Sequence, residues 1–304
     1  MPHEVVLEHV AGALEVGLRQ QPRLPGRLVG LALQARLLPE AYLEGARYVF
    51  EHNLVGHPTY LLGHADLVSG PRSYHAIAFV VKNTPGFLVA TLLALASLRR
   101  RESWRPRSLS CHAIAAAVAV FAAVSCGRIQ IGERYILAAY PYLILVAAPA
   151  LARLSRGRGR AAAALAIAAH VGPALVQLPR GYVPYFNTLA GGTEGGHTVL
   201  ADSNLDWGQD LPRLAAWMRA HGVTEIQLAY HGADDPDRFG IRHTDLPGLH
   251  LYAPRPPERP YQGTFVLSPN LLLGLYQPPG ENPYAALLAR PPDARAGVFF
   301  VYRD

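Results

Sequence analysis

Four long apolar runs, separated by short polar connections, most constrain the fold of this 304-residue chain. They cover residues 76–98, 109–127, 135–154 and 161–179. An α-helix needs about 20 mostly apolar residues to cross a membrane, and each run meets or approaches that length. Half of all residues are hydrophobic and only 16% are charged, which is fewer charges than the roughly 25% of an average soluble domain. The sequence therefore predicts an α-helical transmembrane bundle of about four helices over residues 75–179.

The first apolar run is the least regular of the four. Its interior contains, in order, Lys82, Asn83, Thr84, Pro85 and Gly86. Proline interrupts helical hydrogen bonding, and polar backbone at membrane depth needs partners from the protein. We therefore predict that this run enters the bilayer with a polar, kinked outer end and continues as a regular helix.

The placement of arginine predicts the orientation of the helices. The connections RRRESWRPR and RLSRGRGR are strongly basic, whereas GRIQIGER, between the second and third runs, is less so. Basic connections remain on the cytoplasmic side of a membrane. This assignment places the residues before Tyr74 and everything after Pro179 on the outer side.

The first 74 residues are expected to form an amphipathic N-terminal segment followed by an outer loop. Residues 4–20 and 26–37 are amphipathic but too short and polar to span a membrane, which favours interfacial or packing helices. No signal-peptide pattern begins the chain. The net charge of +6 arises from arginines clustered between the apolar runs rather than along one face, so nucleic acid is not an expected partner.

Residues 180–304 have the pattern of a small soluble α/β domain. Leu211, Leu214, Ala215 and Met218 repeat with helical spacing, with Asp210 at the N-cap position. The apolar segments TVLADSN, EIQLAY, GTFVLSP and GVFFVYR predict strands around this helix. Strands that alternate with helical segments indicate a sheet that is at least partly parallel.

The segment ADSNLDWGQDL superficially resembles the start of a calcium-binding loop. Asp202, Asn204 and Asp206 alternate like the ligands of an EF-hand, but Trp207 stands where the loop needs glycine and Arg213 where it needs glutamate. We interpret the segment as a turn whose side chains bind free backbone amides. The thirteen histidines show no ligand spacing, so the sequence predicts neither a metal site nor a cofactor.

Three groups of strings resemble one protein family. They are LLPEAYLEGARYVFEHNLVGHPTYLLGH with AIAFVVKNTPGFL, then GERYILAAYPYL, then VPYFNTLAGG with LADSNLDWGQDLPRL. Together they look like the C-terminal half of bacterial membrane glycosyltransferases of the GT-C, family 39-like type, related to protein mannosyltransferases and to the aminoarabinose transferase that modifies lipid A. The similarity covers about residues 38–304. Its most specific part is the motif formed by Asp202, Asn204, Asp206, Trp207, Gln209 and Asp210.

The resemblance implies a multi-pass protein of the bacterial inner membrane with its C-terminal domain on the extracytoplasmic side. Its members transfer a sugar from a polyprenyl-phosphate carrier to an acceptor at the outer face of that membrane. Their acidic catalytic motif lies in a loop that precedes the region of similarity. Glu40, Glu44, Glu51 and Asp66 do not match that motif, so no catalytic residue is assigned. We expect this chain to lack that half or to receive it from a partner chain.

The cationic part of a carrier site can be named from the residues present. Lys82 is a charge inside an apolar run, which favours a functional role or a partner; the alternative is that it reaches the headgroups. Arg134 and Tyr135 match the family's arginine and aromatic residue before a proline-containing helix, and otherwise serve as interface anchors. With Tyr74, these residues are the predicted contacts of the carrier phosphate. A non-catalytic, membrane-anchored module that binds a lipid-linked saccharide or a partner subunit is the alternative function.

Overall fold

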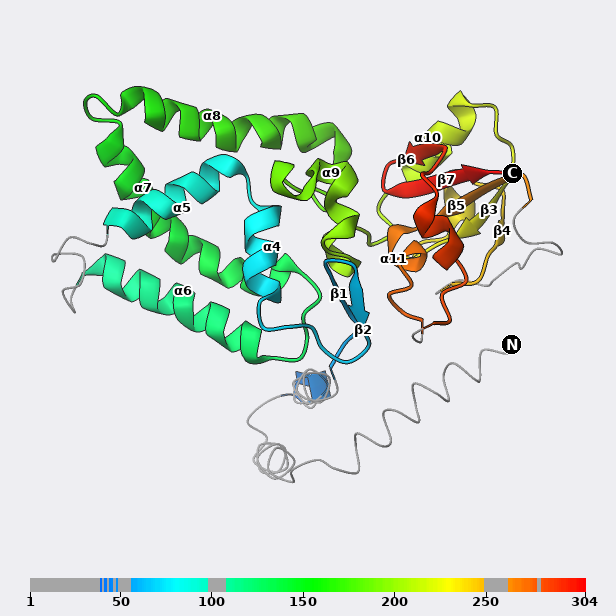
Figure 1. Ribbon diagram of the computed structural model, residues 1–304, viewed down its shortest axis with the longest axis horizontal. Helices are drawn as coiled ribbons and strands as arrows, with labels where there is room; N and C mark the ends of the chain where they lie inside the picture. Colours follow the sequence, from blue (N-terminus) through cyan, green and yellow to red (C-terminus); the bar gives the residue numbers. More distant parts are fainter. Residues whose placement is uncertain are drawn as a thin grey trace.

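The chain forms a helical part followed by an α/β part. The computed structural model describes residues 56–97, 108–248, 262–277 and 280–304, with single positions between 39 and 48. The helices gather at one end of the long axis and the sheet at the other (Figure 1). The expected amphipathic segments 4–20 and 26–37 lie outside the described residues. The predicted fold class, helices followed by a small α/β unit, is confirmed at this level.

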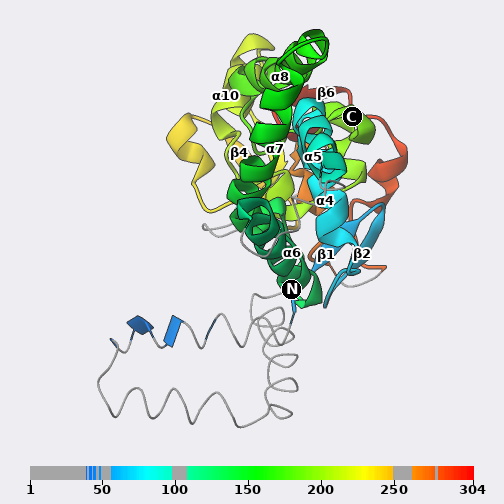
Figure 2. The ribbon, with the colours of Figure 1, turned by 90° about the vertical axis from the view of Figure 1, so that its left-hand side faces the viewer.

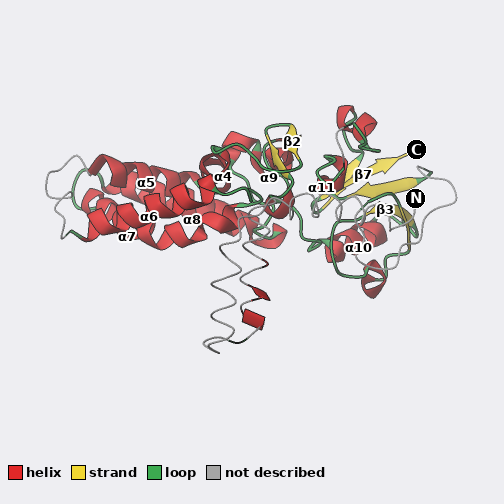
Figure 3. Ribbon diagram, turned by 90° about the horizontal axis from the view of Figure 1, so that it is seen from below, coloured by secondary structure: helices red, strands yellow, loops and turns green. Residues whose placement is uncertain are grey.

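The helical part is built from α4 to α8, with a 3-10 segment, η2, before α7. Their bounds are α4 Tyr74–Lys82, α5 Pro85–Ser97, α6 Leu109–Cys126, η2 Glu133–Ala139, α7 Tyr140–Leu154 and α8 Arg160–Gln177. Three continuous stretches are long and apolar enough to cross a membrane: Leu109–Cys126, Glu133–Leu154 and Arg160–Arg180. They agree closely with the last three predicted runs. Seen from below, α5 to α8 lie side by side along the long axis (Figure 3).

Small residues fill the inside of this bundle. A buried cluster joins α5, α6 and α7 through Ala90, Ala94, Ala113, Val146, Ala147 and Ala150. Large apolar side chains point outward instead, and Leu92, Val118 and Leu165 are between 60 and 70% exposed. Small residues let helix backbones approach closely where lipid, rather than water, surrounds the helices. The distribution is the one expected for a bundle with an apolar solvent.

The first run is sharply broken rather than mildly kinked. The axes of α4 and α5 differ by 119°, and the pair counts as a fourth span only if both helices belong to one crossing. The predicted break beside Pro85 is correct in position, but α4 lies across the end of the bundle (Figures 1 and 2). Asn187 fixes the break, because its Nδ2 donates to the carbonyls of Val80 at 2.6 Å and Asn83 at 2.8 Å. These bonds replace those that the helix loses where it ends.

The sheet has the strand order β4-β3-β5-β7-β6. Its strands are β3 Ile226–Ala229, β4 His243–Asp245, β5 Thr264–Leu267, β6 Ala294–Ala296 and β7 Phe299–Arg303. β3 pairs in parallel with β4 and β5, whereas β7 is antiparallel to β5 and β6. The prediction of a partly parallel sheet is confirmed, as are the strands within EIQLAY, GTFVLSP and GVFFVYR.

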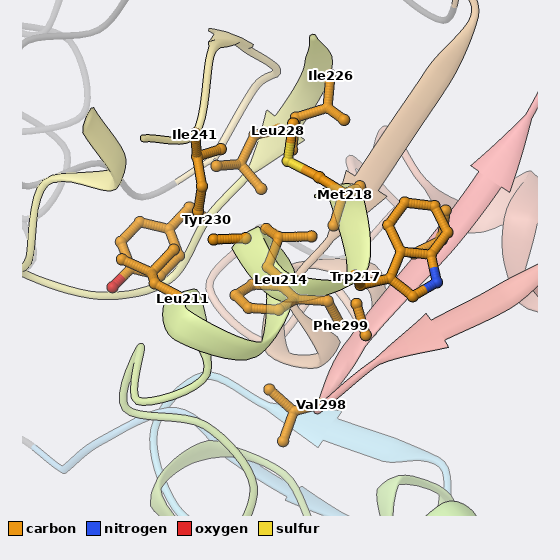
Figure 4. Packing of buried hydrophobic residues seen from close by; sticks show 14 residues of the cluster. Leu211, Leu214, Trp217, Met218, Ile226, Leu228, Tyr230, Ile241, Val298 and Phe299 are labelled. Carbon is orange, nitrogen blue, oxygen red and sulfur yellow. The ribbon is translucent and has the colours of Figure 1, made fainter. Parts of the chain in front are cut away.

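Both faces of the sheet are buried. On one face α10 (Leu211–Ala220) packs Leu214 and Met218 against Leu228 and Phe299 (Figure 4). On the other face the short helix α11 (Pro269–Leu272) shares a cluster with neighbouring strand residues, Phe265 and Phe300 among them. Adjacent residues of β7 thus enter opposite clusters, as strand geometry requires. The predicted helical periodicity over residues 211–218 is confirmed.

The prediction of a strand over TVLADSN is wrong. Leu200 forms only an isolated bridge with Leu61, which belongs to the hairpin of β1 (Thr59–Leu61) and β2 (His64–Asp66). Short helical turns precede and overlap the segment, namely η4 Thr188–Ala190, α9 Gly192–Gly195, η5 Gly196–Thr198 and η6 Asp202–Asn204. Asp202 adopts a left-handed backbone, φ 58°, which ends extended structure there. The segment packs on α4 and β1, so residues beyond 180 first extend the helical part.

Candidate functional site at the junction of the two parts

The motif of residues 202–210 lies where the helical part meets the α/β part. Asn204 is its centre and is 2% exposed. Its Nδ2 donates to Tyr74 Oη and to the Ala201 carbonyl, each at 2.9 Å, while its Oδ1 accepts from the Glu133 amide at 3.1 Å. One side chain therefore joins α4, the start of η2 and the motif. The sequence did not predict that Tyr74 binds the motif.

Lys82 is partly buried. Its Nζ donates to the carbonyls of Val183 at 2.7 Å and Asn204 at 2.8 Å, and lies 4.3 Å from the centre of the Phe186 ring. Two carbonyls and an aromatic face surround the ammonium group, and the nearby Glu133 carboxylate interacts with it electrostatically. Lys82 thus has partners within the protein, one of them on the motif, and its contact with a carrier phosphate stays a prediction.

Arg134 is the exposed cation of the site. Its guanidinium lies 4.8 Å from the centre of the Trp207 ring and 5.4 Å from that of Tyr135. Within the part of the chain that the structure describes, this side chain forms no hydrogen bond or ion pair. Trp207, 53% exposed, is held by its Nε1, which donates to the Ser203 carbonyl at 3.2 Å. The result is a cation on an aromatic platform with its donors free for an anion.

The remaining polar side chains of the motif bind backbone groups, as interpreted from the sequence. Asp206 accepts from the Gly208 amide at 2.8 Å, and Gln209 accepts from the Trp207 amide at 2.6 Å. Asp210 occupies the predicted N-cap position of α10 but does not cap it. Its carboxylate accepts from the Val298 amide at 2.8 Å and pairs with Arg213. The motif is thereby tied to the turn between β6 and β7.

A second polar group was missed by the sequence analysis. His57, two residues before β1, places Nδ1 3.7 Å from Asp202 Oδ2, and the Tyr276 hydroxyl hydrogen-bonds the same carboxyl. His231 stacks on Tyr276 with ring centres 5.1 Å apart. Burial raises the pKa of Asp202, an effect that His57 opposes. Only the tertiary fold unites residues this distant in sequence, so no local pattern signals them.

Three buried polar atoms of this junction form no hydrogen bond with any residue that the structure describes: Asp202 Oδ2, Asp206 Oδ2 and His231 Nδ1. Buried polar atoms are usually satisfied by protein or by ordered water. Among the described residues, no three His, Cys, Asp or Glu side chains are arranged to hold a metal ion.

Asp66 of the outer loop takes no part in this group. Asp66 accepts from the amides of Val68 at 2.8 Å and Ser69 at 2.9 Å, and these bonds lower its pKa. Glu44 lies at a described but exposed helical position, whereas Glu40 and Glu51 lie outside the described residues. Asp66 thus stabilises the turn in which it lies. That none of these carboxylates is the catalytic base stays a prediction.

The buried carboxyl of Asp206 predicts a pH dependence of stability. Burial raises its pKa to about 7, whereas an unfolded aspartate titrates near 4. Between those values the folded state holds a proton that the unfolded state has lost, so the free energy of unfolding falls as pH rises from about 4 to 7. Asp206→Asn retains an acceptor for the Gly208 amide. Its free energy of unfolding should exceed that of the wild type by roughly 2 to 4 kcal/mol above pH 7, and the two should differ little near pH 4.

Urea unfolding of the detergent-solubilised chain between pH 4 and 8 measures this difference. Glu281→Gln, at an exposed position, is the control and should follow the wild type at every pH. Parallel pH profiles for Asp206→Asn and the wild type would contradict the assignment.

Comparison with protein-family models, with curated proteins and with solved structures found no match to this chain. The geometry of its own residues is therefore the basis for a functional proposal.

Proposed function

We propose that this chain is a membrane protein of the glycosyltransferase family named above, which binds a polyprenyl-phosphate-linked sugar at the outer ends of its helices. The observation that carries the proposal is the contact between Arg134 and Trp207. It joins the predicted phosphate ligand to the most specific motif of the resemblance, although 73 positions separate them in the sequence. A free guanidinium suits a phosphate, and an exposed aromatic face suits a sugar ring or an isoprenoid chain.

The arrangement of the bundle supports a membrane location. Its outward side chains are large and apolar, and three stretches have spanning length. The connection that carries Arg153, Arg156 and Arg158 lies at the end of the bundle remote from the sheet (Figure 1). With this basic end in the cytoplasm, as arginine-rich connections prefer, the α/β part faces the outside of the inner membrane.

Within the proposal the predicted residues have different tasks. Arg134 meets the carrier phosphate, and Tyr135 and Trp207 flank it. Tyr74 and Lys82 act indirectly, because both bind Asn204 and thereby hold Trp207 in place. Deprotonation of the acceptor hydroxyl requires a base in addition to these residues.

A non-catalytic module is the second candidate. It is favoured by the structural use of Asp66, which leaves the outer loop without a free matching carboxylate among its described residues. Such a module would present the lipid-linked saccharide to a partner subunit that supplies the base. A transfer assay separates the candidates: movement of radiolabelled sugar from carrier to acceptor by the purified chain supports the enzyme, and carrier binding without transfer supports the module.

Charge reversal at Arg134 tests the carrier site. Arg134→Glu should weaken binding of a short-chain polyprenyl phosphate at least about tenfold, because a charge-assisted hydrogen bond contributes about 1.5 to 3 kcal/mol. Binding is measured by titrating the chain in zwitterionic nanodiscs. Arg72→Glu, the same change at an exposed position before α4, should bind within about twofold of the wild type. If both variants lost the same affinity for the polyprenyl phosphate, the effect would arise from surface charge in general, and the assignment of Arg134 would be refuted.

A further inference from the structure

A separate cavity of about 250 Å³ lies between the outer end of α8 and the α/β part. Two residues of the motif segment, Leu205 and Asp210, line this cavity, whereas Trp207 does not. Its volume exceeds the space of several water molecules, each of which occupies about 30 Å³ in the liquid. The cavity can therefore hold a group larger than a single ion.

Three guanidinium groups from three different elements line this cavity. Arg180 follows α8, Arg213 belongs to α10, and Arg295 belongs to β6. Arg213 pairs with Asp210 and donates to the Pro179 carbonyl at 3.0 Å, which fixes its position. Arg180 forms no hydrogen bond or ion pair within the described ranges. Cations that converge from several directions suit a tetrahedral anion better than a planar carboxylate.

The third guanidinium is oriented by an aromatic ring. Arg295 lies 4.1 Å from the centre of the Phe300 ring, and its Nη2 donates to the Glu194 carbonyl at 3.2 Å. Stacking and one backbone acceptor leave most of its five donors unused. Phe300 also lines the cavity, which provides an apolar wall beside the cations.

The acidic residues of the lining do not cancel this charge. Asp210 is already neutralised by Arg213 and accepts from a backbone amide. Glu194 is exposed and acts on Arg295 across the rim of the cavity. The lining contains three guanidinium groups and two carboxylates, so it carries an excess positive charge even when His197 is neutral. Burial and the nearby Arg295 lower the pKa of His197, which favours its neutral form.

We infer that this cavity is a second anion site, which binds a phosphate ester through Arg180 and Arg295. The volume and the Phe300 wall fit a phosphate attached to an organic group. Two sources share that chemistry: a soluble sugar phosphate and the headgroup of an anionic phospholipid. The site is distinct from the one at Arg134, since the two have no lining residue in common, and either proposal can fail alone.

Binding measurements on the full chain test this inference. Glucose 1-phosphate is titrated against the chain in zwitterionic nanodiscs, and in a second arm retention of phosphatidylglycerol by the detergent-solubilised chain is quantified. Arg180→Gln and Arg295→Gln should each weaken the phosphate ligand about tenfold, the order expected for one charge-assisted hydrogen bond. Arg219→Gln, at an exposed position of α10 outside the cavity, should leave binding unchanged.

Each outcome decides the inference. If the arginine variants lose binding of glucose 1-phosphate, the natural ligand is a soluble phosphate ester. If they lose only the retention of phosphatidylglycerol, the ligand is a phospholipid headgroup. Equal binding by Arg180→Gln, Arg219→Gln and wild type in both arms overturns the site. Because Arg295 packs on Phe300, Arg295→Lys is included to retain charge in case Arg295→Gln fails to fold, and Arg180→Gln, at an exposed position, provides an independent reading.

Discussion

Replacing Asn204 with leucine should lower the free energy of unfolding by roughly 3 to 5 kcal/mol. The side chain is buried and binds four groups: Tyr74 Oη, the Ala201 and Ile131 carbonyls, and the Glu133 amide. Leucine leaves these partners buried without replacement bonds, and each buried unsatisfied group costs about 1 to 3 kcal/mol. Since these groups lie on α4, on η2 and the residues before it, and on the turn before Asn204, the loss falls on the contact between the helical bundle and the motif.

The neighbouring residue provides a matched control. Ser203 donates one hydrogen bond to the Ile131 carbonyl in the same turn, so Ser203→Ala should cost only about 1 kcal/mol. Chemical unfolding in a mild detergent, followed by near-ultraviolet circular dichroism, compares the two variants. Equal costs would mean that Asn204 does not hold the junction.

Reversing the charge of Lys82 should prevent the chain from folding. Glutamate would bring a carboxylate towards the carbonyls of Val183 and Asn204 and the face of Phe186, all of which now bind a cation. Breaking a buried charge arrangement in this way costs about 3 to 5 kcal/mol, a large part of a typical domain's stability. Arg134→Glu should accumulate normally, because that side chain is exposed.

Size-exclusion chromatography of detergent extracts measures this contrast. Lys82→Glu is expected to yield little monodisperse protein, whereas Arg134→Glu should elute like the wild type with weakened carrier binding. Lys82→Met, which removes the charge without reversing it, should be intermediate. If Lys82→Glu folded normally and lost only carrier binding, Lys82 would be a direct phosphate ligand, as the family resemblance implied.

The elements that could be predicted from the sequence are those with local causes. An apolar run specifies its own helix because its length and composition suffice, and the ends of the last three runs are correct within two residues. The helix from Leu211 and the strands β3, β5 and β7 also follow from periodicity within each segment. Strands β4 and β6 were missed, because three residues are too few to establish an alternation.

The features that escaped prediction depend on distant partners. Val199, Leu200 and Ala201 look like strand residues, but a left-handed Asp202 and the surface of α4 impose turns instead. Lys82 is conspicuous in the sequence because a charge in an apolar run is unusual, but the carbonyls that its Nζ binds lie 101 and 122 positions away, so no local pattern indicates them. The candidate site likewise exists only after residues from opposite ends of the chain have met.

The asparagine that fixes the bend between α4 and α5 also sets an order of assembly. Asn187 is made 104 residues after Asn83, whose carbonyl it binds. At a synthesis rate of about 5 to 20 residues per second, the ribosome needs roughly 5 to 20 s to produce that partner. Until then the carbonyls of Val80 and Asn83 lack this partner. The bend therefore receives these hydrogen bonds only after every helix of the bundle, α8 included, has been synthesised.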